Sequence, residues 1–218
     1  MTEPGGTEQG PTEPGRLAMF PLSTVLFPHT GLPLLVFEER YRAMVADCLA
    51  DDSPFGVVLI SRGSEVGGGD TRVDVGTVAH IDLAQPLAQG RWRIVARGVE
   101  RLRVTSWHPD DPYPVATVET WPTPPETQTH ELVQRAQREV RRVRALLSEL
   151  GEVPALAPEL QLGEDPEIIG WRLCAVAPIG VLDRQRLLEA PTIGERIALL
   201  VDLVHAVGRD ATRMLEGG

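Results

Sequence analysis

Short apolar runs broken by proline and glycine fill the first half of the chain. LAMFPL and PLLVFE (33–38) flank a loop around Pro28 and Gly31, and FGVVLIS (55–61) is continuously apolar. Such runs between turn residues predict short β-strands, and the third is typical of a strand buried on both faces. Between the second and third runs the period becomes that of an α-helix. One stripe of that helix holds Tyr41, Met44, Val45, Cys48 and Leu49.

Four further strands are predicted before residue 122. They are VGTVAHIDLA (75–84), RWRIVARG (91–98), ERLRVTSW (100–107) and YPVATVETW (113–121). In the second and third of these, apolar residues alternate with arginines, which is typical of an antiparallel hairpin with one wet face. The hairpin is predicted to turn at Gly98. The glycine-rich stretch 62–71 is predicted to be a loop.

After the proline-rich segment 121–127 the pattern becomes helical for the rest of the chain. A long stripe is formed by Leu132, Ala136, Val140, Val143, Leu147 and Leu150. Asp165 before Pro166, and Thr192 with Glu195, are helix-start signals, and Gly180 precedes a third start. The second half is therefore predicted to be a bundle of about four helices.

These elements predict an α+β protein of 218 residues, enough for one large domain or two small ones. Residues 1–15 lack apolar side chains after Met1 and are expected to be a disordered tail. We expect a compact barrel or sandwich with one helix at 16–121, a linker at 122–127 and a helical bundle at 128–216.

Charge and composition exclude several functions. The formal net charge is −10, which argues against a protein whose main work is gripping a phosphate backbone. All 21 basic residues are arginines. The absence of lysine excludes Schiff-base chemistry, a Ser-Lys dyad and a P-loop lysine.

The two cysteines, Cys48 and Cys174, lie within apolar helical patterns and are expected to be buried free thiols. With no secretory signal pattern at the N-terminus, we expect a cytoplasmic protein without disulfides. No apolar run approaches the ~18–20 residues needed to cross a bilayer, so no membrane contact is expected.

No catalytic or metal-binding constellation stands out. The histidines at 29, 80, 108, 130 and 205 have no zinc-ligand spacing, and no serine lies in a GxSxG motif. No metal and no cofactor are therefore expected. An enzyme with an unrecognised site stays open as a third hypothesis, which a cleft holding His29 or His80 beside an acid would favour.

Two segments are candidate binding sites. The predicted hairpin carries Arg91, Arg93, Arg97, Arg101 and Arg103, which could bind an anion or RNA. The overall charge makes a solvated face paired with carboxylates the favoured interpretation. The segment from Phe20 to Tyr41 holds three of the four phenylalanines close to prolines. Any that line a groove would form an apolar site for extended peptides.

The same segment carries a family resemblance. FPLSTVLFPHTGLPLLVFEERYRAMV (20–45) resembles the opening of the N-terminal, substrate-binding domain of Lon proteases. FGVVLI, VGTVAHI, GRWRIVARGVERLRV and YPVATV resemble its later strands, and DRQRLLEAPTIGERIALLVDLV (183–204) resembles the end of its helical part. His29 stands where the family usually has glycine.

The resemblance implies a PUA-like β pseudo-barrel followed by a helical bundle, and recognition of unfolded or damaged polypeptide. The chain ends where a full Lon continues into its ATPase and protease, so the resemblance implies a stand-alone, non-catalytic domain. It leaves open whether a separate protease or ATPase acts with it. The expected peptide groove is lined or flanked by Phe27, Pro28, Phe37, Glu38, Arg40 and Tyr41. RNA or nucleotide binding by the arginine hairpin is the alternative.

Overall fold

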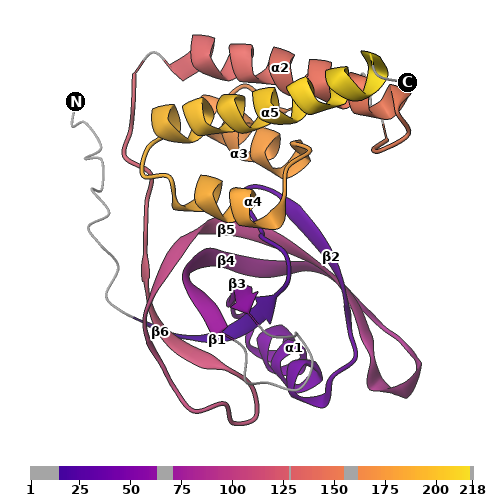
Figure 1. Ribbon diagram of the computed structural model, residues 1–218. Helices are drawn as coiled ribbons and strands as arrows, with labels where there is room; N and C mark the ends of the chain where they lie inside the picture. Colours follow the sequence, from indigo (N-terminus) through magenta and orange to yellow (C-terminus); the bar gives the residue numbers. More distant parts are fainter. Residues whose placement is uncertain (1–14, 63–70, 128, 155–161, 217–218) are drawn as a thin grey trace, which may run out of the picture.

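The computed structural model describes residues 15–62, 71–127, 129–154 and 162–216 (Figure 1). The sheet half holds β1 (Gly15–Leu22), β2 (Gly31–Val36), α1 (Glu39–Asp51), β3 (Phe55–Arg62), β4 (Thr71–Pro86), the 3-10 turn η1 (Ala88–Gly90), β5 (Trp92–Trp107) and β6 (Val115–Thr120). The helical half holds α2 (Thr129–Glu149), α3 (Pro166–Val176), α4 (Val181–Glu189) and α5 (Ile193–Glu216). The predicted α+β class, a β pseudo-barrel with one helix followed by a helical bundle, is confirmed.

The strands close into a barrel because β5 pairs at both ends of the sheet. Among the described residues the order is β2-β5-β4-β3-β1-β6, with a further pairing of β5 and β6. The first part of β5 pairs with β2, from Trp92 opposite Val36 to Arg97 opposite Gly31. Its later part pairs with β6, from Leu102 opposite Thr120 onward. The 16-residue length of β5 lets it pair with both β2 and β6 on the same side.

The predicted hairpin turn at Gly98 is wrong. β5 runs unbroken from Trp92 to Trp107, and Val99 forms a bulge where the register with β4 shifts. Gly98 serves a close approach: a Cβ atom there would lie 2.3 Å from the carbonyl oxygen of Phe27. A turn and a close approach both favour glycine, so the local pattern could not separate them.

The two faces of β1 pack into different parts of the sheet-half core. Met19 packs with Val58 and Leu102. Phe20 stacks on Tyr41 of α1, with ring centroids 4.3 Å apart. The predicted helical stripe is confirmed at its buried positions Tyr41, Met44, Val45 and Cys48. Leu49 of that stripe is instead partly exposed.

In the helical half, α2 and α5 run side by side, and α3 and α4 lie between them and the sheet (Figure 1). The predicted caps are confirmed: Asp165 Oδ1 accepts from the Glu167 and Ile168 amides, and Thr192 Oγ1 accepts from the Glu195 amide. In α2, Val133 is buried and Leu132 is 45% exposed, so the predicted stripe is wrong at its first position.

The two halves share a core at their junction. Phe27 lies 5.9 Å from Trp171 of α3 between ring centroids, in a cluster that joins Val25 and Leu59 to the helices. Gln185 of α4 donates to the Val75 carbonyl of β4 at 3.0 Å. The tail expected at 1–15 lies almost wholly outside the described residues, as does most of the loop expected at 62–71. The domain boundaries stay predictions.

Candidate functional site

An apolar hollow lies beside β2 and the start of α1. Its volume is about 210 Å3. It is lined by Phe20, Leu22, Pro33, Leu34, Leu35, Val36, Phe37, Glu38 and Tyr41. Phe20, Leu22 and Tyr41 form its buried wall, while Leu35 and Phe37 are 53% and 54% exposed. Large apolar side chains exposed next to a hollow are typical of binding surfaces.

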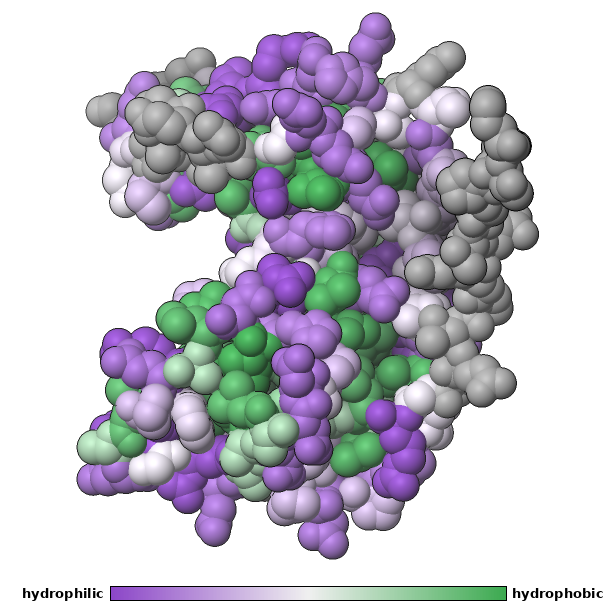
Figure 2. All heavy atoms as spheres, turned by 180° about the vertical axis from the view of Figure 1, so that it is seen from behind, coloured by the Kyte–Doolittle hydropathy of each residue, from purple (hydrophilic) through white to green (hydrophobic). Residues whose placement is uncertain are grey.

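The apolar surface continues across neighbouring strands on the outer face of the sheet. Pro33 of β2 lies opposite Val95 of β5, and Val95 lies opposite Leu83 of β4. Leu83 is 58% exposed. We call Pro33, Leu35, Phe37, Leu83 and Val95 the β2 surface. Figure 2 shows apolar atoms gathered on the sheet half, below a notch that separates it from the helical half.

The sequence signal for this surface lies in β2 itself. The β2 sequence GLPLLV contains no charged residue, although Gly31, Pro33 and Leu35 face outward. A proline inside a strand indicates an edge strand, and an edge strand normally carries charges that discourage docking. Leu83 and Val95 gave no such signal, because only the pairing of β4, β5 and β2 brings them beside Pro33.

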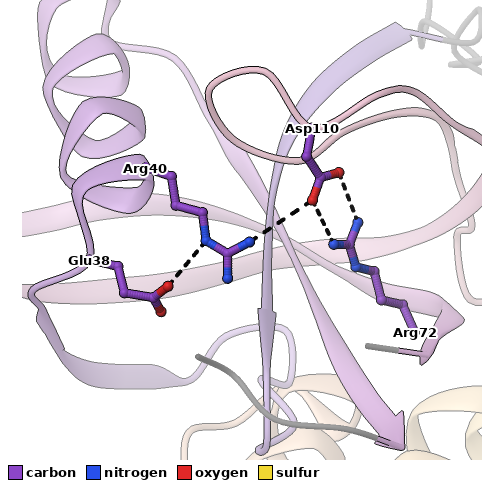
Figure 3. A network of polar contacts seen from close by, with 4 residues as sticks. All are labelled: Glu38, Arg40, Arg72 and Asp110. Atoms are coloured by element: carbon purple, nitrogen blue, oxygen red, sulfur yellow. Dashed lines mark hydrogen bonds and ion pairs between the residues drawn. The ribbon is translucent and has the colours of Figure 1, made fainter. Parts of the chain in front are cut away.

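A chain of ion pairs fixes the polar end of the hollow (Figure 3). Arg40 Nε lies 3.2 Å from Glu38 Oε2, and its Nη1 lies 4.0 Å from Asp110 Oδ2. Asp110 also pairs with Arg72 at 2.9 Å. The Arg40 guanidinium covers the Tyr41 ring, 4.5 Å from its centroid. Glu38 therefore lines the hollow with a carboxylate that is ion-paired with Arg40 and held in place by it.

The predicted groove residues fall into two separate places. Phe37, Glu38 and Tyr41 line the hollow, and Arg40 flanks it. Phe27 is 1% exposed in the core between the halves. Pro28 lines a second hollow of about 210 Å3 at the junction. Phe27 and Phe37 both stand near proline in the sequence, but Phe27 is covered by α3 and has no surface to offer a ligand.

The arginines of the candidate anion site do not share one solvated face. Arg101 is 2% exposed, so the predicted alternation is wrong at this position. Its guanidinium donates to the carbonyls of Leu188, Ala190 and Pro191 and lies over Trp121. Burial lowers the pKa of Arg101 to about 10.

The other four arginines of that set are dispersed. Arg97 pairs with Asp82 at 3.0 Å, and Arg103 lies over Trp121 from β5. Arg91 and Arg93 donate to neutral oxygens of Ala88 and Gln85 near the β4–β5 connection. These contacts do not favour the RNA-binding alternative, because two of the five cations are occupied by a carboxylate or by the core.

The second hollow brings His29 near acids without linking them. His29, Glu100 and Glu167 all line it. Among the described residues, no hydrogen bond or ion pair joins His29 to either carboxylate. Thr123, in the same hollow, contacts Arg101 and Arg196. His80 lies on β4 away from this hollow. The hollow therefore places His29 and two carboxylates on one lining without a hydrogen bond between them in the described residues.

No cluster of histidine, cysteine or acidic side chains within the described parts of the chain could hold a metal ion. His205 instead pairs with Glu139 at 3.0 Å, and His108 contacts the Thr117 hydroxyl at 2.8 Å. Both cysteines are buried and free, as predicted. Among the described helices, none is long and apolar enough to cross a membrane.

Residues 16–206 match the family model of the ATP-dependent protease La (LON) substrate-binding domain. The chain belongs to the Lon substrate-binding domain family. The resemblance seen at residues 20–45 is thereby confirmed, and the match takes in both the barrel and most of the helical half. The hollow and the β2 surface are therefore features of a substrate-binding domain.

Relatives of this Lon substrate-binding domain are longer proteases. Lon protease 2 of Myxococcus xanthus is 26% identical over 195 residues, which cover 88% of this chain and 24% of that protein. Lon protease of Escherichia coli (strain K12) is 24% identical over 185 residues, covering 84% and 23%. The chain thus spans about a quarter of the length of the curated relatives it matches.

Solved structures show the same fold. The Lon N-terminal domain protein of Xanthomonas campestris has a TM-score of 0.62 and 26% identity, covering 86% of this chain and 98% of that one. The N-terminal domain of Mycobacterium avium complex Lon protease also has a TM-score of 0.62, at 16% identity, covering 88% and 98%.

Proposed function

We propose that this domain is a non-catalytic module that binds extended, partly unfolded polypeptide through the hollow and the β2 surface. The observation that carries the proposal is the pair of half-exposed side chains, Leu35 and Phe37, beside a hollow with an apolar wall. Unfolded segments differ from folded surfaces chiefly in their exposed apolar side chains, and this surface is built to cover such groups.

The expected affinity follows from the size of the surface. Full burial of one large apolar side chain contributes about 1.5–3 kcal/mol, so a few anchors supply a favourable gross term. Ordering a flexible segment opposes much of it. The domain should therefore bind weakly, in the micromolar range, and tolerate many sequences.

The proposal extends to the fate of the bound chain. The relatives that match are named proteases and are about four times as long as the matched region. We infer that the domain presents damaged polypeptide to a protease or ATPase in quality control. The buried free thiols Cys48 and Cys174 support a reducing, cytoplasmic setting.

Fluorescent, reduced and carboxymethylated casein tests the binding step. Phe37→Ser and Leu35→Ser should each weaken binding several-fold without changing the fold, because both side chains are half exposed. Leu182→Ser is the matched control, since Leu182 is 64% exposed but lies on α4 in the helical half. No binding by the wild type, or an equal loss in all three variants, would contradict the proposed site.

A further inference from the structure

The outer edge of β2 has no strand beside it. β2 stands at the end of the strand order, and among the described residues it pairs with β5 alone. Its backbone N–H and C=O groups on the far side therefore lack ladder partners. A row of such groups is a template for another extended chain.

The alternation of hydrogen-bonded and non-bonded positions between β2 and β5 shows which residues direct their backbone groups to this edge. The Gly98 amide donates to the Thr30 carbonyl at 2.9 Å, and the Gly98 carbonyl accepts from the His29 amide at 2.8 Å, so Thr30 directs its carbonyl toward β5 just before β2 begins. Bonded and non-bonded pairs alternate in an antiparallel ladder. Pro33, opposite Val95, thus falls at a non-bonded position, where its missing N–H costs no hydrogen bond to β5. Gly31 and Leu35 direct both N–H and C=O groups to the free edge, whereas Pro33 directs only its C=O group there.

We propose that an extended polypeptide segment binds by adding as a strand to the outer edge of β2. This inference rests on the proposed function and states how the backbone of the ligand is recognised. One set of alternate side chains of the added strand would lie with Leu35 and Phe37. The other set would face the hollow walled by Phe20 and Tyr41. Backbone pairing is indifferent to sequence, which accounts for broad tolerance.

Charge favours a segment with acidic flanking residues. Arg93 lies opposite Leu35 in the ladder, and Arg91 is close by at the start of β5. Arg93 is exposed and Arg91 is partly exposed, and in the part of the chain that the structure describes neither is within ion-pair distance of a carboxylate. The nearest acid of the hollow, Glu38, is already paired with Arg40. The end of the edge near Arg93 is therefore cationic, complementary to carboxylates beside the apolar stretch.

The decisive probe is a synthetic peptide, Thr-Leu-Thr-Val-Thr-Leu-Asp-Asp, carrying a fluorescent label. Two modified forms carry N-methyl groups, one on its threonines and one on its leucines and valine. Successive amides of a strand point to opposite sides. One form should therefore bind about tenfold more weakly or worse, since it loses the hydrogen bonds to β2. The other form should bind nearly as well as the parent peptide.

The protein side of the test uses residue 35. Leu35→Pro removes the N–H that faces the free edge and leaves the hydrogen bonds between β2 and β5 intact, because residue 35, like Pro33, lies at a non-bonded position of that ladder. Leu35→Ala removes only apolar surface. We expect Leu35→Pro to weaken binding about fivefold beyond Leu35→Ala. Circular dichroism and thermal unfolding verify that both fold. If Leu35→Pro does not fold, the two N-methylated peptides decide alone.

A charge arm and a self-association arm complete the design. Replacing Asp-Asp by Lys-Lys should weaken binding, and Arg93→Gln should reduce that difference. If both N-methylated peptides lose the same affinity, or if neither loses any, strand addition is overturned. Casein binding by the wild type would still support the proposed function in that case. A wild type that binds neither peptide nor casein overturns both. A dimer that Leu35→Pro dissociates, with no peptide bound, assigns the edge to a second copy and overturns the inference.

Discussion

Arg196 of α5 lies over the ring of Trp171 of α3, with its guanidinium carbon 3.4 Å from the ring centroid, and both side chains are buried. Its Nη2 donates to Thr123 Oγ1 at 3.3 Å, while Nε and Nη1 have no hydrogen-bond partner within the described residues. Burial lowers the pKa of Arg196 to about 10. The cation is thus held mainly by an aromatic face.

We expect Arg196→Met to leave the free energy of unfolding unchanged or to raise it. Desolvating a guanidinium costs several kcal/mol. One hydrogen bond contributes about 1 kcal/mol and a desolvated cation–π contact about 2 kcal/mol, so methionine of similar length loses little. Urea unfolding measures the change.

Arg101→Met is the contrast to that variant. It leaves the carbonyls of Leu188, Ala190 and Pro191 without their donor at the junction. We expect the free energy of unfolding to fall by about 2 kcal/mol or more. A larger loss for Arg196→Met than for Arg101→Met would contradict this account of the two cations.

Phe27→Ala and Phe37→Ala should have opposite effects on stability and binding. Phe27 is packed on Trp171, so its truncation should cost about 3–5 kcal/mol of unfolding free energy. Phe37 is half exposed, so its truncation should cost about 1 kcal/mol or less but weaken casein binding several-fold. Thermal unfolding and fluorescence anisotropy measure the two quantities. Strong casein binding by the Phe37→Ala domain would speak against the assigned surface.

Gly98→Ala and His29→Gly test the contact that β5 makes with the loop following β1. A methyl group at 98 would meet the Phe27 carbonyl oxygen at 2.3 Å, so we expect a loss of about 3 kcal/mol. His29 has φ 58, in the left-handed region. Glycine there relieves about 1–2 kcal/mol of strain but loosens the unfolded chain by a similar amount. The free energy of unfolding should change by less than about 1 kcal/mol. Similar losses in both variants would refute the close-approach role of Gly98.

Stability should fall in alkaline solution because of Cys174. Burial raises the pKa of its thiol to about 12, from 9.0 for an unperturbed cysteine. Between these pH values the unfolded chain binds fewer protons than the folded one, so the free energy of unfolding decreases as pH rises. The contribution is complete below about pH 9 and is lost toward pH 12.

Cys174→Ala isolates that contribution. The variant loses packing at neutral pH, and its deficit relative to wild type should shrink as pH rises toward about 10.5. Tyr113, whose pKa is raised to about 12 chiefly by burial, is present in both proteins and cancels in the comparison. A deficit that stays constant with pH would show that Cys174 does not titrate differently on folding.

Local features of the sequence were sufficient for most elements. The helix α1, the starts of α3 and α5 and the apolar strand β3 follow from periodicity and capping, since these depend on residues within one or two turns. The family resemblance at 20–45 also needed only the order of residues. Pro33 within an uncharged strand could have marked β2 as an edge.

The tertiary structure decided which of two locally similar residues does what. Arg97 and Arg101 occupy similar alternating patterns, but the carbonyls at the end of α4 bury Arg101 while Arg97 meets Asp82 in solvent. Phe27 and Phe37 diverge because α3 covers the first, whereas the described chain leaves the second 54% exposed. Burial of a side chain depends on elements that are far away in the sequence, and a local pattern does not show which of these elements will pack against it.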